Sequence, residues 1–247
     1  MKTDNLIYGL HAVNAALDAG TITELWALQN RQDKRLQAVR DNARNKQITV
    51  HNADRDLLDR MTANARHQGI VARLNDTGVQ LPQDLDSLLD SLTEPAFLLV
   101  LDGVQDPHNL GACLRVANAA GVHAIIAPKD RAAGLTPAAR KVASGAAERT
   151  PFIQVTNLAR ALRQLRDTGI WLVGAAGEAE QTLYSARLTG PLALVMGAEG
   201  TGLRRLTREH CDELIKLPMH GTVSSLNVSV ASGICLYEAV RQRSTQK

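Results

Sequence analysis

The chain has 247 residues, of which 45% are apolar, and its formal net charge is +3. A chain of this size and composition can bury one large core or two smaller ones, so a globular protein of one or two domains is expected. No apolar run approaches the roughly 18 residues that a membrane helix needs, and Asp4 precedes the first apolar stretch, so neither membrane insertion nor export is expected and a cytoplasmic location is predicted.

Charge divides the chain into three segments. Residues 1–73 carry a net charge of +3, residues 74–95 carry −5 and residues 96–247 carry +5. The middle segment contains glycine and prolines, which favour turns, and is interpreted as an acidic linker with one short helix at Leu85–Leu92. Two basic domains on either side of this linker are therefore predicted, and their charge is compatible with an anionic partner.

The first domain alternates short apolar runs with one clear helical pattern. The apolar runs are TELWAL at 23–28 and GIVARL at 69–74. Between them, Leu36, Val39 and Ala43 recur at helical spacing in the stretch DKRLQAVRDNA. This pattern predicts a small α/β domain.

Residues 96–247 repeat the alternation more strongly. Helical patterns separate six compact apolar runs, which are AFLLVL, HAIIA, FIQV, IWLVG, LALVM and ELIKL. One of the helices is expected to begin after Thr156 or Asn157 and to end at Gly169. Continuous apolar strands between helices predict a parallel sheet covered on both faces, and ligands of such sheets bind at the carboxyl ends of the strands.

The stretch LALVMGAEGTGLRR at 192–205 combines a strand with a glycine-rich loop. Its glycine order, G-x-x-G-x-G, differs from the dinucleotide-binding G-x-G-x-x-G, and no Lys-Ser/Thr pair follows as in a P-loop. Glu199 would face any phosphate in the loop, so a cationic ligand without phosphate, such as S-adenosylmethionine, fits better. An alternative is that the glycines form only a tight turn and that Glu199 caps a helix beginning near Gly202.

The stretch LDGVQDPHNLGACLRVANAAG follows the first strand of this domain and opens a helix. Asn109 can cap that helix, and Arg115 is the only Lys or Arg between positions 74 and 128. An arginine in such a place can clamp a phosphate with two parallel hydrogen bonds. The alternative is a structural ion pair with Asp102 or Asp106.

The stretch LPMHGTVSSLNVSVASGICLYEAVRQR follows the last strand. Ser224, Ser225 and Asn227 crowd the start of a long helix. One such side chain suffices for a cap, so three small polar groups favour a functional site, with ordinary capping as the alternative. The apolar face expected for this helix consists of Leu226, Val230, Ile234 and Tyr237.

Together, these three stretches resemble the motifs of the SpoU (TrmH-like) RNA ribose 2′-O-methyltransferases in order and spacing. The matching patterns are D-x-x-x-D-P-x-N-x-G-x-x-x-R at 102–115, V-M-G-x-E-G-x-G-L at 195–203 and L-P-M-x-G-x-x-x-S-L-N-V-S at 217–229. IYGLHAVNAAL at 7–17 and HQGIVAR at 67–73 are similar to that family's substrate-binding domain. The resemblance therefore covers nearly the whole chain.

The resemblance implies a fold and a cofactor. Residues 96–247 are expected to form a parallel-sheet SPOUT methyltransferase domain with a trefoil knot, and residues 1–73 a small α/β domain that binds the RNA substrate. S-adenosylmethionine would bind in the knot, and a homodimer with the active site near the subunit interface is implied. The cofactor-binding residues implied by position are Val195, Met196, Gly197, Leu217, Met219 and Leu226.

The implied reaction moves a methyl group from a sulfonium to a ribose 2′-oxygen, and the likeness of the N-terminal segment implies a guanosine of 23S rRNA as the acceptor. The implied catalytic residues are Arg115, Asn109, Glu199, Ser224 and Asn227. Since a guanidinium stays protonated, Arg115 is expected to hold the adjacent phosphate and polarise the hydroxyl, with Asn109 and Ser224 completing the hydrogen bonds. A phosphate oxygen or water would take the proton, and Glu199 is expected to fix its loop.

No metal site is expected, because the three cysteines lack C-x-x-C spacing and the histidines lack H-x-x-H spacing; His210 and Cys211 are interpreted as a helix end. The aromatic content of 3% argues against base-stacking platforms, so phosphate contacts are favoured, from NRQDKR at 30–35 and RHQ at 66–68. Either charged run can instead be a solvated face.

Three alternatives for the function stay open: a non-catalytic RNA-binding protein, a nicotinamide-dependent oxidoreductase and a tRNA methyltransferase.

Overall fold

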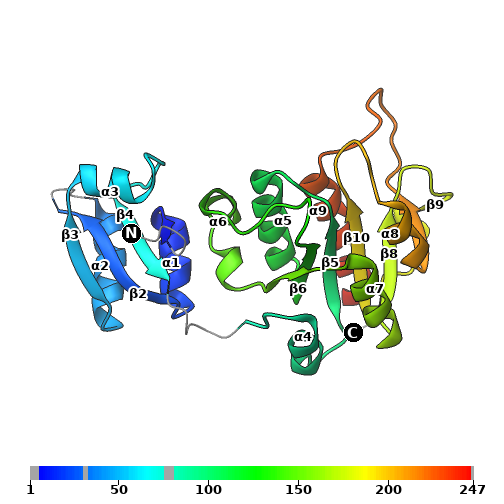
Figure 1. Ribbon diagram of the computed structural model, residues 1–247, viewed down its shortest axis with the longest axis horizontal. Coiled ribbons are helices and arrows are strands. Elements are labelled where there is room, and N and C mark those ends of the chain that lie inside the picture. The colour runs from blue at the N-terminus through cyan, green and yellow to red at the C-terminus, as the bar shows by residue number, and fades with distance from the viewer. Residues whose placement is uncertain (1–5, 30–32, 75–80, 246–247) are drawn as a thin grey trace.

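The structure is a computed structural model that describes residues 6–29, 33–74 and 81–245, and it contains two sheets with separate cores (Figure 1). The first sheet has the strand order β1-β4-β2-β3, with β4 antiparallel to both neighbours and β2 parallel to β3. Its strands are β1 (Leu6–Tyr8), β2 (Ile22–Leu28), β3 (Thr49–Ala53) and β4 (Ile70–Leu74). Helices α1 (Leu10–Asp18) and α2 (Lys34–Asn45) cover one face and α3 (Arg55–Met61) covers the other. The predicted small α/β domain is confirmed.

The second sheet has seven strands, and every pairing in it is parallel. The strand order is β7-β6-β5-β10-β8-β11-β9. The strands are β5 (Phe97–Asp102), β6 (Ala124–Pro128), β7 (Phe152–Val155), β8 (Trp171–Ala175), β9 (Gln181–Thr182), β10 (Leu192–Gly197) and β11 (Glu213–Lys216). All six apolar runs predicted as strands are confirmed. The two-residue strand β9 was not predicted, because no apolar run marks it in the sequence.

Helices cover both faces of this sheet. One face carries α5 (Pro107–Ala119), α6 (Pro137–Ala143) and α9 (Val228–Ser244), with the short 3-10 helices η1 (Ala146–Glu148) and η2 (Leu183–Ser185). The other face carries α4 (Leu85–Ser91), α7 (Leu158–Asp167) and α8 (Arg205–His210). The predicted short helix and the helix end at His210 are thereby confirmed.

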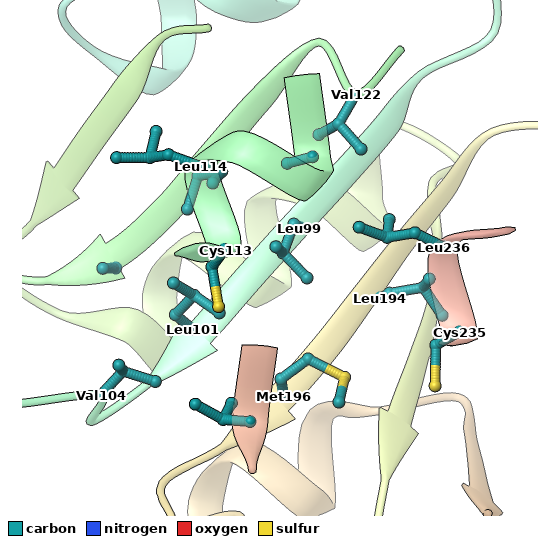
Figure 2. Close-up of a cluster of buried hydrophobic side chains, with 14 of the residues drawn as sticks. Leu99, Leu101, Val104, Cys113, Leu114, Val122, Leu194, Met196, Cys235 and Leu236 are labelled. Atoms are coloured by element: carbon teal, nitrogen blue, oxygen red, sulfur yellow. The ribbon is translucent and has the colours of Figure 1, made fainter. Parts of the chain in front are cut away.

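Burial on both faces explains the apolar runs. In β5, Leu99 and Leu101 enter the core beneath α5 and α9, whereas Leu98 and Val100 enter the core beneath α7. Figure 2 shows the first of these cores, in which side chains of β5 and β10 meet those of α5 and α9. The labelled contributors from these elements are Leu99, Leu101, Cys113, Leu114, Leu194, Met196, Cys235 and Leu236.

Helix α7 begins and ends as its sequence predicts. The Asn157 side chain accepts a hydrogen bond from the Arg160 amide at 3.0 Å, and Gly169 ends the helix with a φ of +83°. Helix α5 differs from expectation, because Asp106 caps it by accepting from the His108 amide, while Asn109 lies inside its first turn. The prediction that Asn109 caps this helix is therefore wrong.

Helix α9 corrects part of the prediction: of the expected face, Ile234 packs against the core, Leu226 precedes the helix, and the other two residues are exposed. Val230 and Tyr237 are 51% and 50% exposed. The buried residues of the helix are Val228, Ser232, Cys235, Leu236, Glu238 and Ala239. A polar residue can belong to this face because the Ser232 hydroxyl donates to the Val228 carbonyl at 2.7 Å, which satisfies it internally.

The two domains contact each other through α6 and η1. Gly145, with a φ of +92°, lies so close to Ala15 of α1 that a Cβ at position 145 would be 2.2 Å from the Ala15 Cβ. In the part of the chain that the structure describes, no helix has the length and apolarity needed to cross a membrane.

Candidate functional site

A cavity of about 400 Å³ lies at the carboxyl ends of β8, β10 and β11. Three segments line it: residues 175–178 after β8, residues 196–202 at the end of β10, and residues between positions 215 and 231 that run from β11 into α9. This is the edge of a parallel sheet where ligands bind, and two of the three motif stretches supply its walls.

The glycine loop after β10 folds back on its own strand. Gly202 donates its amide to the Ala198 carbonyl at 2.9 Å, and Gly200 and Gly202 have φ values of +81° and +65°. A Cβ at Gly197 would lie 2.1 Å from the Gly202 carbonyl carbon and 2.4 Å from the Leu203 nitrogen. The loop therefore closes only because position 197 has no side chain.

A buried carboxylate fixes the far end of this loop. Asp102, which is 1% exposed and pairs in register with Gly197, accepts from the Arg204 amide at 2.8 Å and forms an ion pair with the Arg204 guanidinium. Helix α8 begins at Arg205 without a side-chain cap, so the alternative in which Glu199 caps it is wrong. The predicted alternative, an ion pair between Asp102 and Arg115, is absent from the described residues.

The charges on the cavity wall have one sign. Glu178 and Glu199 line the cavity, and no Lys, Arg or His among the described residues does so. Glu178 pairs with Arg208, which lies outside the wall, and no hydrogen bond or ion pair involves Glu199 within the described residues. The structure therefore provides no contact by which Glu199 would fix its loop.

Most of the predicted cofactor-binding residues reach this cavity. Those on its wall are Met196, Gly197, Leu217, Met219 and Leu226, together with the predicted catalytic residues Glu199 and Ser224. Val195 does not line it, because the alternation along β10 turns its side chain into the opposite core. Ser224 and Ser225 are exposed wall residues without a hydrogen-bond partner in the described chain. They are thus not needed as caps.

Asn109 and Asn227 connect the remaining motif stretch to the cavity. The Asn227 side-chain nitrogen donates to the Asn109 side-chain oxygen at 2.9 Å, while its own oxygen caps α9 by accepting from the Ser229 amide at 2.9 Å. Neither asparagine lines the cavity, although Asn227 lies between the wall residues Leu226 and Val228. The pair therefore holds the starts of α5 and α9 together beside the wall.

Arg115 lies on α5, away from the cavity wall. Its side chain is exposed and forms no hydrogen bond or ion pair within the described residues. The structural alternative is wrong, because Asp102 pairs with Arg204 and Asp106 with His108. The Arg115 guanidinium is available to an anion from outside the chain.

Comparison with known families matches both halves of the chain. Residues 96–237 match the SpoU rRNA Methylase family, and residues 6–77 match the family described as RNA 2′-O ribose methyltransferase substrate binding. The chain belongs to the SpoU methylase family.

Relatives of this SpoU methylase span its whole length. The 23S rRNA (guanosine-2′-O-)-methyltransferase RlmB of Escherichia coli (strain K12) is 58% identical over 241 residues, which are 97% of this chain and 99% of RlmB. The crystal structure of the SpoU methyltransferase AviRb from Streptomyces viridochromogenes in complex with AdoMet is 26% identical, with a TM-score of 0.82 over 97% of this chain and 90% of AviRb.

A tRNA-modifying SpoU protein matches less of the chain. The crystal structure of the A. aeolicus TrmH/SpoU tRNA modifying enzyme is 30% identical, with a TM-score of 0.57, and the match covers 62% of this chain and 79% of that one. More than a third of the present SpoU methylase therefore lies outside that match.

Proposed function

We propose that this protein transfers a methyl group from S-adenosylmethionine to the ribose 2′-oxygen of a guanosine in 23S rRNA. The observation that carries the proposal is that two SpoU motif stretches, far apart in sequence, line one cavity, while the Asn227–Asn109 hydrogen bond holds the third stretch beside it. The 58% identity to RlmB over nearly the full length supports the same reaction and the same class of RNA.

The cavity suits the proposed cofactor in size and charge. Its volume lies within the range of roughly 300–1,000 Å³ typical of small-molecule sites. S-adenosylmethionine carries a sulfonium and no phosphate, and the described residues of the wall include two glutamates and no cationic side chain. Met196, Gly197, Leu217, Met219 and Leu226 would hold it. When bound, it supplies an electrophilic methyl group.

The chain's own residues then orient the acceptor. A ribose hydroxyl is a weak nucleophile, so alignment and stabilisation of the developing alkoxide provide much of the rate enhancement. We assign Arg115 to the phosphate beside the target ribose, and Asn109 and Ser224 to hydrogen bonds that place the hydroxyl. Asn227 positions Asn109 through their hydrogen bond. A phosphate oxygen or water takes the proton, because a guanidinium stays protonated. Glu199, on the cavity wall, faces the cationic cofactor.

The proposal includes a homodimer. The exposed face of α9 carries Val230 and Tyr237, and Val223 in the preceding loop is also exposed. Pairing two copies through this face would remove apolar side chains from water. Tyr237→Arg should therefore yield a monomer in sedimentation analysis; a dimer as stable as the wild-type one would contradict this assignment.

The domains have separate roles in the proposal. Residues 1–73 bind the RNA, residues 74–95 link, and residues 96–247, whose chain path we expect to contain a trefoil knot, catalyse. Since the substrate is ribosomal RNA, we place the protein in the cytoplasm. The 58% identity to the 23S rRNA methyltransferase over 97% of the chain, against 62% coverage by the tRNA-modifying SpoU protein, favours rRNA over tRNA.

The test is methylation of unmodified 23S rRNA with labelled S-adenosylmethionine. A methylated 2′-oxygen cannot attack its own phosphodiester, so alkaline hydrolysis should leave a gap in the ladder at one guanosine. Label in a nucleobase would produce no gap and would overturn the acceptor. Label in tRNA alone would overturn the choice of RNA.

A further inference from the structure

A second cavity, of about 590 Å³, lies in the first domain at the sheet edge where β2 ends and β4 begins. Three separate segments each bring an arginine to it. Arg35 comes from the first turn of α2, Arg55 from the first turn of α3, and Arg66 from the turn that precedes β4. Asp33 and Asp59 also line this cavity, so arginines exceed carboxylates by one, whereas the described wall of the other domain's cavity has two glutamates and no basic residue.

Hydrogen bonds of the two residues after Arg66 hold in place the turn that carries it. His67 is 8% exposed; its Nε2 is 3.0 Å from an Asp59 carboxylate oxygen, and its Nδ1 accepts from the Gly69 amide at 3.0 Å. The Gln68 side-chain oxygen accepts from the Leu10 amide at 3.0 Å. These contacts tie the turn to α3 and α1, so Arg66 projects from a fixed backbone.

Two of the three arginines lack an acidic partner. Arg55 lies 3.7 Å from Asp59, but neither Arg35 nor Arg66 forms a side-chain hydrogen bond or ion pair within the described residues. By contrast, Arg44 at the other end of α2 pairs with Asp41. Two free guanidinium groups at the rim of one cavity are suited to bind phosphate oxygens.

No Phe, Tyr or Trp is among the described residues that line this cavity, so these residues offer no platform for base stacking. We infer that it binds the phosphate backbone of the RNA substrate, with Arg35 and Arg66 as the phosphate ligands. This inference rests on the proposed function, which supplies the RNA. In Figure 1, the turn between α3 and β4 (cyan) and the loop between β11 and α9 (orange) both lie at the upper side of the molecule, as one RNA spanning both domains requires.

The assay measures binding and turnover separately. Unmodified 23S rRNA transcript is titrated in a filter-binding assay between 50 and 300 mM KCl (about a sixfold range, chosen because phosphate contacts are salt-dependent), and initial methylation rates give KM and kcat. The test variant is the double substitution Arg35→Ala and Arg66→Ala. The single substitution Arg35→Ala is measured beside it, and Arg44→Ala is the matched control for that single variant, because it removes one arginine from α2 away from the cavity.

Loss of two phosphate contacts should lower the slope of log K against log salt by about 1.8 and raise the RNA Kd and KM roughly tenfold. The kcat, the melting temperature and the S-adenosylmethionine Kd should stay at wild-type values. Arg66→Lys, which keeps the charge, should retain most of the salt slope. Arg44→Ala should leave the RNA affinity close to wild type.

A double variant with the RNA affinity and salt slope of Arg44→Ala would overturn the inference. If the proposed function failed instead, the wild-type chain would bind the transcript without methylating it. The binding assay would still show whether Arg35 and Arg66 contribute to the RNA affinity. A wild-type chain that did not bind the transcript would overturn the inference as well.

Discussion

Gly197 provides the sharpest test of the cofactor site. A methyl group at this position would lie 2.1 Å from the carbonyl carbon of Gly202, 2.4 Å from its oxygen and 2.4 Å from the nitrogen of Leu203. All three atoms belong to the backbone, so no side-chain rotation can relieve the contact. In Gly197→Ala the glycine loop must move away from β10 by about 1.3 Å to reach ordinary contact distance.

The expected loss of cofactor affinity follows from the position of the displaced loop. Overpacking at a tight site costs about 1–3 kcal/mol, and the upper end applies because the backbone itself is displaced. The loop is a wall of the cavity, so opening it spoils the fit to the cofactor. About 3 kcal/mol corresponds to a rise of roughly 100-fold in the Kd for S-adenosylmethionine. Isothermal titration measures this Kd directly, and circular dichroism reports that the variant is folded.

Alanine substitutions at two other glycines distinguish the effect of a steric clash on the cofactor Kd from the effect of backbone strain. At Gly200, φ is +81° but no atom lies within 4 Å of the added methyl group, so Gly200→Ala should cost about 1 kcal/mol of strain and roughly fivefold in Kd. At Gly221, space is open and φ lies outside the left-handed region, so Gly221→Ala should bind as the wild type does. Cofactor affinity within twofold of wild type in Gly197→Ala would refute the closed-loop argument.

Three further results are expected. Arg115→Ala should lower methyl transfer on the order of 100-fold or more while the cofactor Kd stays unchanged, since the side chain lies off the cavity wall; ordinary turnover would remove Arg115 from the mechanism. Deleting residues 1–75 should leave a folded domain that binds S-adenosylmethionine but has lost rRNA methylation, because the two sheets have separate cores; full activity of the truncated chain would contradict the RNA-binding role. Burial raises the pKa of Cys113 to about 11 and the pKa of Cys235 to about 12, so these two buried thiols are neutral at pH 8 and iodoacetamide should label them only after unfolding; rapid native labelling of either would contradict its burial.

Local patterns were sufficient to predict most helices and strands. Strands buried on both faces leave continuous apolar runs, and the ends of α7 follow from the side chain of Asn157 and the left-handed Gly169. The strands that no run indicated are short or polar. Strand β3, an edge strand with the sequence TVHNA, buries only Ala53, so it lacks an apolar signature.

Strand order is the information that the sequence pattern lacks. Periodicity identifies β5 and β10 as strands, but not that they are neighbours, with Asp102 directly opposite Gly197. That register brings the first motif beside the second, and it gives the buried Asp102 carboxylate its partner Arg204, 102 positions along the chain. With Asp102 thus engaged, Arg115 has no acidic partner. A sequence argument that weighed only nearby charges could not separate these outcomes.

The sequence pattern predicts helix α9 correctly but does not identify correctly which residues of the helix face the sheet. Its sequence is apolar on more than one face, and helical spacing alone cannot decide which face meets the sheet. The structure packs Val228, Cys235 and Leu236 against α5 and β10. Ser232 can lie on the same face because its hydroxyl donates to a carbonyl within the helix. Of the face predicted as core, Ile234 packs against the core, but Val230 and Tyr237 are left exposed. The same apolar character that made it resemble a core face is what the proposed second copy would cover.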